Sequence, residues 1–200
     1  MNHLDRIYTK DIEQFSLSYF DYLKKVIDRV DLSEIKHLIT EFLSARERGS
    51  TIYFIGNGGS AATASHFAND LSYGTNDYIK PFKVMSLTDN VAILTALGND
   101  YGFDDIFASQ LKIHAKKDDV LVGISASGNS QNLINAFEYA SSIDVKTFAL
   151  TAFDGGKLKK ISEHCIHVPT EINEYGPAED VHMILDHLIG SYLMRYIKLE

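Results

Sequence analysis

Hydrophobic residues in the first fifty positions recur at the spacing of helices. The first series is three or four residues apart and so forms one stripe of a helix: Ile12, Phe15, Tyr19, Leu23, Val26 and Val30. Asp31 and Glu34 have the spacing of a capping box and open a second apolar series over residues 35–42, which Gly49 ends. Two amphipathic helices need an apolar surface to cover. That surface is either the protein's own sheet or a second subunit.

From Thr51 onward, short β-rich runs alternate with helical stretches. The expected strands are 51–55, 82–87, 120–124, 146–150 and 165–168, and the expected helices are 61–71, 91–97, 105–115, 131–142, 157–162 and 178–196. Several strands are apolar on consecutive residues, as expected for strands that are buried on both faces. Repeated strand–helix units predict an α/β fold, a three-layer αβα sandwich with a five-stranded, parallel, doubly wound sheet. Residues 1–49 are then an N-terminal helical extension for oligomerisation, and residues 50–200 form one domain.

Composition and charge exclude several classes of protein. The 200 residues are 45% hydrophobic, which suffices for a large core, but no apolar run approaches the ~20 residues of a membrane span. The N-terminus lacks the order of a secretory signal, and a lone Cys165 excludes a disulfide framework, so we expect a cytoplasmic protein without a membrane partner. A net charge of −8 without a long basic run argues against nucleic acid. Any anionic ligand must therefore be bound by local geometry.

Two loops have the composition of a phosphate site. Ligands of such sheets bind beyond the carboxyl ends of the strands. The two loops that follow the first and third strands read Gly56-Asn57-Gly58-Gly59-Ser60 and Ser125-Ala126-Ser127-Gly128-Asn129-Ser130. Glycines permit close approach of backbone amides, the serines supply hydroxyls, and each loop leads into the positive end of a helix. This chemistry binds a phosphorylated small molecule without lysine or arginine.

The two loops also have two other interpretations. Either loop alone is often a plain turn between strand and helix. Gly56, Gly58 and Ala61 also match the glycine fingerprint of dinucleotide-binding folds. That fingerprint needs an acidic residue about 20 positions further on, and Asp89 comes roughly ten residues too late. The serine-rich second loop has no role in that scheme either, so a phosphorylated small molecule is favoured.

Taken together, several segments resemble the sugar isomerase (SIS) domain family, and within it the phosphoheptose isomerases. The segments are residues 56–62, 66–68, 94–103, 123–130, 150–151 and 154–157. The resemblance covers most of the chain and implies a parallel αβα sandwich, with residues 50–200 as a SIS phosphosugar-binding domain. Members of the family are commonly homotetramers with active sites between subunits, which would give the N-terminal helices a surface to cover.

The resemblance also implies roles for individual residues. The substrate and phosphate set is Asn57, Gly58, Gly59, Ser60, Asn90, Ser125, Ala126, Ser127, Ser130 and Glu179. Asp70, where the family usually has glutamate, is the expected catalytic base, and His187 is the expected acid. Zn²⁺ is the expected cofactor, with a ligand set of His66, Asp70, Glu179 and His187. Two imidazoles and two carboxylates suit that ion chemically.

The spacing within the last helix limits this metal site. Residues eight apart in a regular helix, such as Glu179 and His187, are separated by about 12 Å along the axis. Both reach one ion only if the helix begins after Glu179, for which Pro177 is suited, or if they come from different subunits. His182 is expected to face the core rather than the site.

The implied activity is aldose–ketose isomerisation through an enediol. The expected substrate is sedoheptulose 7-phosphate and the product D-glycero-D-manno-heptose 7-phosphate. The alternatives are an isomerase of a different phosphosugar and a non-catalytic SIS module, such as the replication-initiator-associating proteins. His66, Asp70 and His187 argue against a pure binding module, since binding alone needs no titratable groups beside a phosphate.

Overall fold

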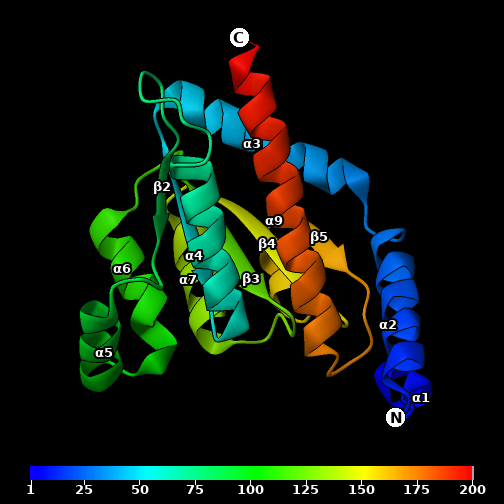
Figure 1. Ribbon diagram of the computed structural model, residues 1–200. Coiled ribbons are helices and arrows are strands. Elements are labelled where there is room, and N and C mark those ends of the chain that lie inside the picture. The colour runs from blue at the N-terminus through cyan, green and yellow to red at the C-terminus, as the bar shows by residue number, and fades with distance from the viewer. Residues whose placement is uncertain (200) are drawn as a thin grey trace.

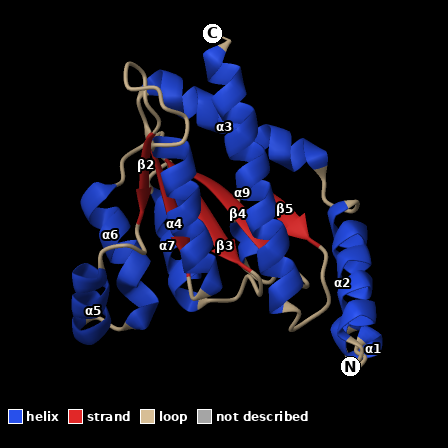
Figure 2. Cartoon of the chain, viewed as in Figure 1, coloured by secondary structure: helices blue, strands red, loops and turns tan. Residues whose placement is uncertain are grey.

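Five parallel strands form the centre of the computed structural model, which describes residues 1–199 (Figure 2). The strands are β1 (Thr51–Gly56), β2 (Lys83–Ser86), β3 (Val120–Ser125), β4 (Lys146–Ala152) and β5 (His164–Val168). Their order across the sheet is β2-β1-β3-β4-β5, and every neighbouring pair is parallel. The predicted α/β class, strand number and doubly wound topology are confirmed, and each strand end lies within two residues of its expected position.

Helices cover both faces of this sheet (Figure 1). One layer holds α2 (Ile12–Ile27), α3 (Leu32–Arg48), α4 (Gly59–Ser72) and α9 (Tyr175–Lys198), with α1 (His3–Ile7) at the end of α2. The other holds α5 (Val91–Asp100), η1 (Phe103–Asp105), α6 (Ile106–His114), α7 (Gln131–Ser142) and α8 (Leu158–Ile161). Successive side chains of β1 point to opposite faces of the sheet and so contribute to the hydrophobic core on each face. Phe54 packs into the core beside the first helical layer, and Ile55 packs into the core beside the second. Within residues 1–199, no helix has the length and apolarity that a membrane span requires.

Helix α3 covers the protein's own sheet. Its residues Leu38, Phe42 and Ala45 are fully buried in the core that contains β1 and β5. In α2, by contrast, Leu17 and Phe20 keep 62% and 65% of their surface exposed. The structure thus answers the open question for α3, which belongs to the domain core, while part of α2 retains apolar surface.

Helix α9 begins earlier than expected. It starts at Tyr175 rather than at residue 178, so Glu179 lies inside a regular helix and the condition that the helix begins after Glu179 is not met. Pro177 causes no break because it occupies the first turn, where a backbone N–H has no partner within the helix. Glu179 and His187 are therefore separated by the full ~12 Å of eight helical residues.

His182 faces the core, as predicted from the sequence. The side chain is fully buried and its Nε2 donates to the backbone oxygen of Thr151 at 3.4 Å. Burial lowers the pKa of His182 to about 4, because desolvation disfavours the charged imidazolium. The folded protein therefore holds this histidine neutral.

This burial predicts a pH dependence of stability. An unfolded chain binds a proton at His182 near pH 6.5, whereas the folded chain does so only near pH 4. The free energy of unfolding should therefore fall as the pH drops through this window, by up to about 3 kcal/mol. His182→Gln keeps a donor but does not titrate, so its stability should exceed that of the wild type increasingly below pH 6.

Urea unfolding at pH 7.0, 5.5 and 4.5 measures the difference between the two proteins. Comparing them removes the contribution of other groups, such as Asp186, whose raised pKa acts in the opposite direction. Parallel pH profiles for wild type and variant would contradict the prediction.

Candidate functional site

The two predicted phosphate loops meet at the carboxyl ends of β1 and β3. Strand β2 pairs with one edge of β1, and β3 pairs with the other edge. The direction in which strands are added therefore reverses at β1, and ligands of such folds bind at this switch point. A cavity of ≈ 140 Å³ lies between the loops and the start of α9. Its lining residues are Asn57, Ser60, Ile124, Ser125, Ala126, Ser127, Ser130, Tyr175 and Glu179.

The helices that begin at this cavity have no side-chain cap. Helix α4 begins after Gly58, which adopts a φ of +54°, and α7 begins after Ser130; neither residue caps its helix with a side-chain hydrogen bond. Elsewhere Asp11 and Asp31 accept hydrogen bonds from the first turns of α2 and α3. No side chain of these two cap residues therefore competes with an anion for the N–H groups at the cavity-facing termini.

Asparagine side chains hold the two loops at a fixed spacing. Asn57 and Asn132 exchange amide hydrogen bonds of 2.9 Å in both directions, which connects the first loop to helix α7. In the second loop, Asn129 donates from Nδ2 to the backbone oxygen of Ser127 at 3.0 Å and accepts from the N–H of Lys157 at 3.0 Å. Asn132 was not predicted, because only the fold brings it opposite Asn57.

The cavity is polar without being basic. None of its lining residues within the described part of the chain is a lysine or arginine, so any anion is held by hydroxyls and amides, as the composition of the loops predicts. Glu179 lies against the first turn of α4, because a Cβ added to Gly59 would overlap its carboxylate. The absence of a Cβ at Gly59 leaves room for the Glu179 carboxylate beside this loop.

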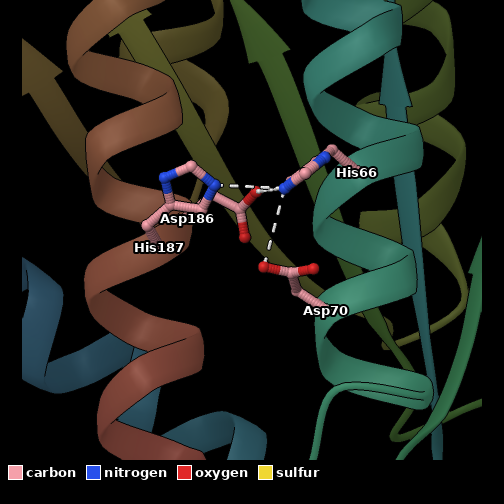
Figure 3. A group of neighbouring side chains, drawn as sticks. All are labelled: His66, Asp70, Asp186 and His187. Carbon is pink, nitrogen blue, oxygen red and sulfur yellow. Dashed lines mark hydrogen bonds and ion pairs between the residues drawn. The ribbon is translucent and has the colours of Figure 1, made fainter.

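A second group of side chains lies between α4 and α9, which run side by side (Figure 1). His66 and Asp70 come from α4, and Asp186 and His187 come from α9 (Figure 3). The Nε2 atom of His66 is 3.1 Å from Nε2 of His187, 3.6 Å from Oδ2 of Asp70 and 3.8 Å from Oδ2 of Asp186. One nitrogen or oxygen atom of each residue lies within 4.8 Å of those of the others.

Asp186 is the buried member of this group, and its environment is unusual for a carboxylate. Asp186 is fully buried, and within residues 1–199 neither of its carboxylate oxygens has a hydrogen-bond partner. Burial, and secondarily the negative charge of Asp70, raises the pKa of Asp186 to about 7. Two imidazoles and two carboxylates that converge in this way fit the donor set of Zn²⁺ or a similar divalent ion.

The structure brings three of the four predicted metal ligands together. His66, Asp70 and His187 converge, while Glu179 lies about two helical turns away in the cavity of the phosphate loops. Asp186 takes the fourth position and was missed. The sequence feature that could have indicated Asp186 is its position, because this carboxylate directly precedes His187 and follows the apolar residues 183–185.

Asn90 lies outside the cavity of the phosphate loops. Its side chain accepts a hydrogen bond from the N–H of Ile93 at 3.2 Å and so caps helix α5. It lines a different pocket, together with Asp89 and Ser65, whose side chains are hydrogen-bonded to each other. Of the predicted substrate residues with functional side chains, Asn90 is the one that does not line this cavity in the described part of the chain.

Comparison with known proteins agrees with this geometry. The model of the SIS domain family matches residues 18–152. The chain belongs to the SIS-domain family. It is 35% identical over 187 residues to the phosphoheptose isomerase of Helicobacter pylori strain P12, which covers 92% of this chain and 95% of that protein. The resemblance inferred from the sequence is therefore confirmed.

Two solved structures extend the comparison to three dimensions. The phosphoheptose isomerase of Neisseria gonorrhoeae has a TM-score of 0.76 at 31% identity, with 89% of this chain and 92% of that chain covered. The phosphoheptose isomerase of Francisella tularensis has a TM-score of 0.80 at 28% identity, with 98% and 100% covered. The similarity includes the helices before the first strand as well as the sheet.

Proposed function

We propose that this SIS protein is a phosphosugar aldose–ketose isomerase that converts sedoheptulose 7-phosphate to D-glycero-D-manno-heptose 7-phosphate. One observation carries the proposal, namely the distance between the anion cavity and the group formed by His66, Asp70, Asp186 and His187. Ser60 and His66 on α4 are about 9 Å apart along the axis, and Glu179 and His187 on α9 about 12 Å. An extended heptose 7-phosphate places carbons 1 and 2, where the reaction occurs, at a comparable distance from its phosphate.

The proposed chemistry moves one proton between adjacent carbons and another between their oxygens. The carboxylate of Asp70 accepts the proton from carbon and returns it to the neighbouring carbon, and His187 exchanges a proton with the substrate oxygens through the enediol. His66, 3.1 Å from His187 and 3.6 Å from Asp70, holds the two groups in relation to each other. The hydroxyls and amides of the two loops bind the phosphate and so fix the sugar chain.

We include Zn²⁺ in the proposal. The converging imidazoles and carboxylates of His66, Asp70, Asp186 and His187 support it. A divalent ion bound there would polarise the substrate carbonyl and its neighbouring hydroxyl.

We further propose a cytoplasmic homotetramer with active sites between subunits. Exposed Leu17 and Phe20 on α2 supply apolar surface for subunit contacts, as does a groove between α3 and α9 that includes Leu43 and Tyr192. The half-exposed ring of His66 leaves the titratable group open to a neighbouring subunit. A lone cysteine is typical of proteins in a reducing compartment.

Turnover of sedoheptulose 7-phosphate by the purified protein tests the proposal. Proton NMR in deuterated water should show the aldose product and deuterium at carbon 2. Sedoheptulose without the phosphate should react with a kcat/KM at least about a hundredfold lower, because it loses several charge-assisted hydrogen bonds. Phosphosugar binding without turnover, with and without Zn²⁺, would instead favour a binding module.

A further inference from the structure

Asp186 differs from the other buried carboxylates of this fold. Asp119 accepts hydrogen bonds from the N–H groups of Thr51 and Lys116 at 2.8 and 3.0 Å. Glu174 accepts from two backbone N–H groups and from the hydroxyl of Tyr22. Asp186 has no such donor among residues 1–199. A buried carboxylate without partners is costly in its charged form, which a positively charged partner at this position would stabilise.

Within residues 1–199, no lysine or arginine forms an ion pair with Asp186. Among the described residues, the ion-pair partner of both Asp186 and Asp70 is the ring of His66. One imidazole carries at most a single positive charge, which is less than the combined charge of two carboxylates. A divalent cation at this point would neutralise both carboxylates at once.

The distances from His66 lie within about 0.5 Å of the spacing between ligands of a shared ion. Bonds of 2.0–2.1 Å in tetrahedral geometry separate neighbouring ligand atoms by about 3.3 Å. Nε2 of His66 lies 3.1, 3.6 and 3.8 Å from the nearest atoms of His187, Asp70 and Asp186. The four side chains point toward one another from two adjacent helices (Figure 3).

The side chain of Glu179 lies away from this group of four residues. Its carboxylate lies against Gly59 in the cavity of the phosphate loops, and helix α9 is continuous from Tyr175 through His187. Eight residues of unbroken helix prevent Glu179 and His187 of one chain from binding the same ion.

We propose that Asp186 is a direct ligand of the divalent ion, together with His66, Asp70 and His187, and that Glu179 contacts the substrate instead of the metal. This inference rests on the proposed metal-dependent isomerase and specifies its ligand set. Each chain then supplies four donors from α4 and α9.

Metal titration of Asp186→Asn and Glu179→Gln tests this assignment. Both variants replace a carboxylate of the same helix with an amide of the same size, so each is the control of the other. Metal-free proteins are titrated with Zn²⁺ by calorimetry and with Co²⁺ by its visible absorption, which reports tetrahedral coordination. We expect Asp186→Asn to weaken Zn²⁺ binding at least a hundredfold and to lose the tetrahedral Co²⁺ spectrum, and Glu179→Gln to change the affinity less than threefold.

A second group of potential ligands must be removed from the measurement. Glu34, His37 and His164, on α3 and β5, also bring ligand atoms within 4.8 Å of one another. All proteins in the titration therefore carry His37→Gln, which leaves two donors there. His37 is exposed, so this change should leave the fold intact.

The outcomes separate the ligand assignment from the activity. Wild-type affinity in Asp186→Asn, a large loss in Glu179→Gln, or a parent protein that binds no metal would each overturn the assignment. Misfolding is checked by thermal unfolding without metal, where Asp186→Asn should melt no lower than its parent because it removes a buried charge. Turnover by a metal-free wild type would leave the isomerase proposal intact while refuting a metal-dependent one, and normal metal binding without turnover would refute the isomerase proposal alone.

Discussion

Asp70→Asn should lower kcat for the isomerisation by about 10²–10⁴-fold, since this is the usual contribution of a positioned general base. Asparagine has the size of aspartate but cannot accept the proton from carbon. The carboxylate of Asp70 lies 3.6 Å from the ring of His66, and its other oxygen accepts from the amide of Asn69 at 3.1 Å. His187→Asn should have a similar effect, because the proton transfer between oxygens then lacks its donor.

The measurement combines kcat, KM and the rate of deuterium incorporation at carbon 2, all at saturating Zn²⁺. KM should change little, because the phosphate cavity lies two helical turns away and is untouched. Ser72→Ala, further along the same helix, is a control that should retain full activity. Unchanged turnover in both Asp70→Asn and His187→Asn would refute the assigned mechanism.

Asp70→Glu separates the position of the base from its identity. The family usually has glutamate here, which extends the carboxylate by one methylene. We expect Asp70→Glu to retain the deuterium exchange that Asp70→Asn loses. A change in its ratio of turnover between seven-carbon and six-carbon phosphosugars would indicate that the shorter side chain adapts this site to its substrate.

Gly128→Ala should be among the most destabilising single changes in the chain. Gly128 has a φ of +62°, which L-residues adopt at a cost, and a Cβ there would overlap the carbonyl oxygen of Gly155. Both partners are backbone, so no side-chain rotation relieves the overlap. We expect a loss of about 3 kcal/mol or more in the free energy of unfolding, and a loss of phosphate affinity in any protein that still folds.

Gly102→Ala is the matched control. Gly102 also has a positive φ, of +98°, but an added Cβ there meets no atom within 4 Å. Its cost should be the backbone strain alone, about 1–3 kcal/mol. Urea unfolding of both variants gives the difference, and equal losses would show that the packing of the second loop against residues 155–156 contributes nothing.

The order of helices and strands was predictable because each element has its own local pattern of hydrophobic and polar residues. Consecutive apolar residues in β1 and β3 reflect burial on both faces, and that pattern needs no partner to be recognised. The two loops were equally predictable, because parallel strands fix the edge at which their carboxyl ends meet. Chain order and composition thus determined the sheet, its helices and the position of the anion cavity.

The convergence of side chains was decided by the tertiary structure. Asp186 meets His66 because α4 and α9 pack at a particular register, and no local pattern encodes the register of two helices 120 residues apart. The pairing of Asn57 with Asn132 has the same origin. Glu179 and His187 were grouped from the sequence as ligands of one ion, but the continuous helix holds them ~12 Å apart. The sequence by itself determined the fold and the chemistry of each loop, whereas the packing of α4 against α9 decided which titratable groups share one site.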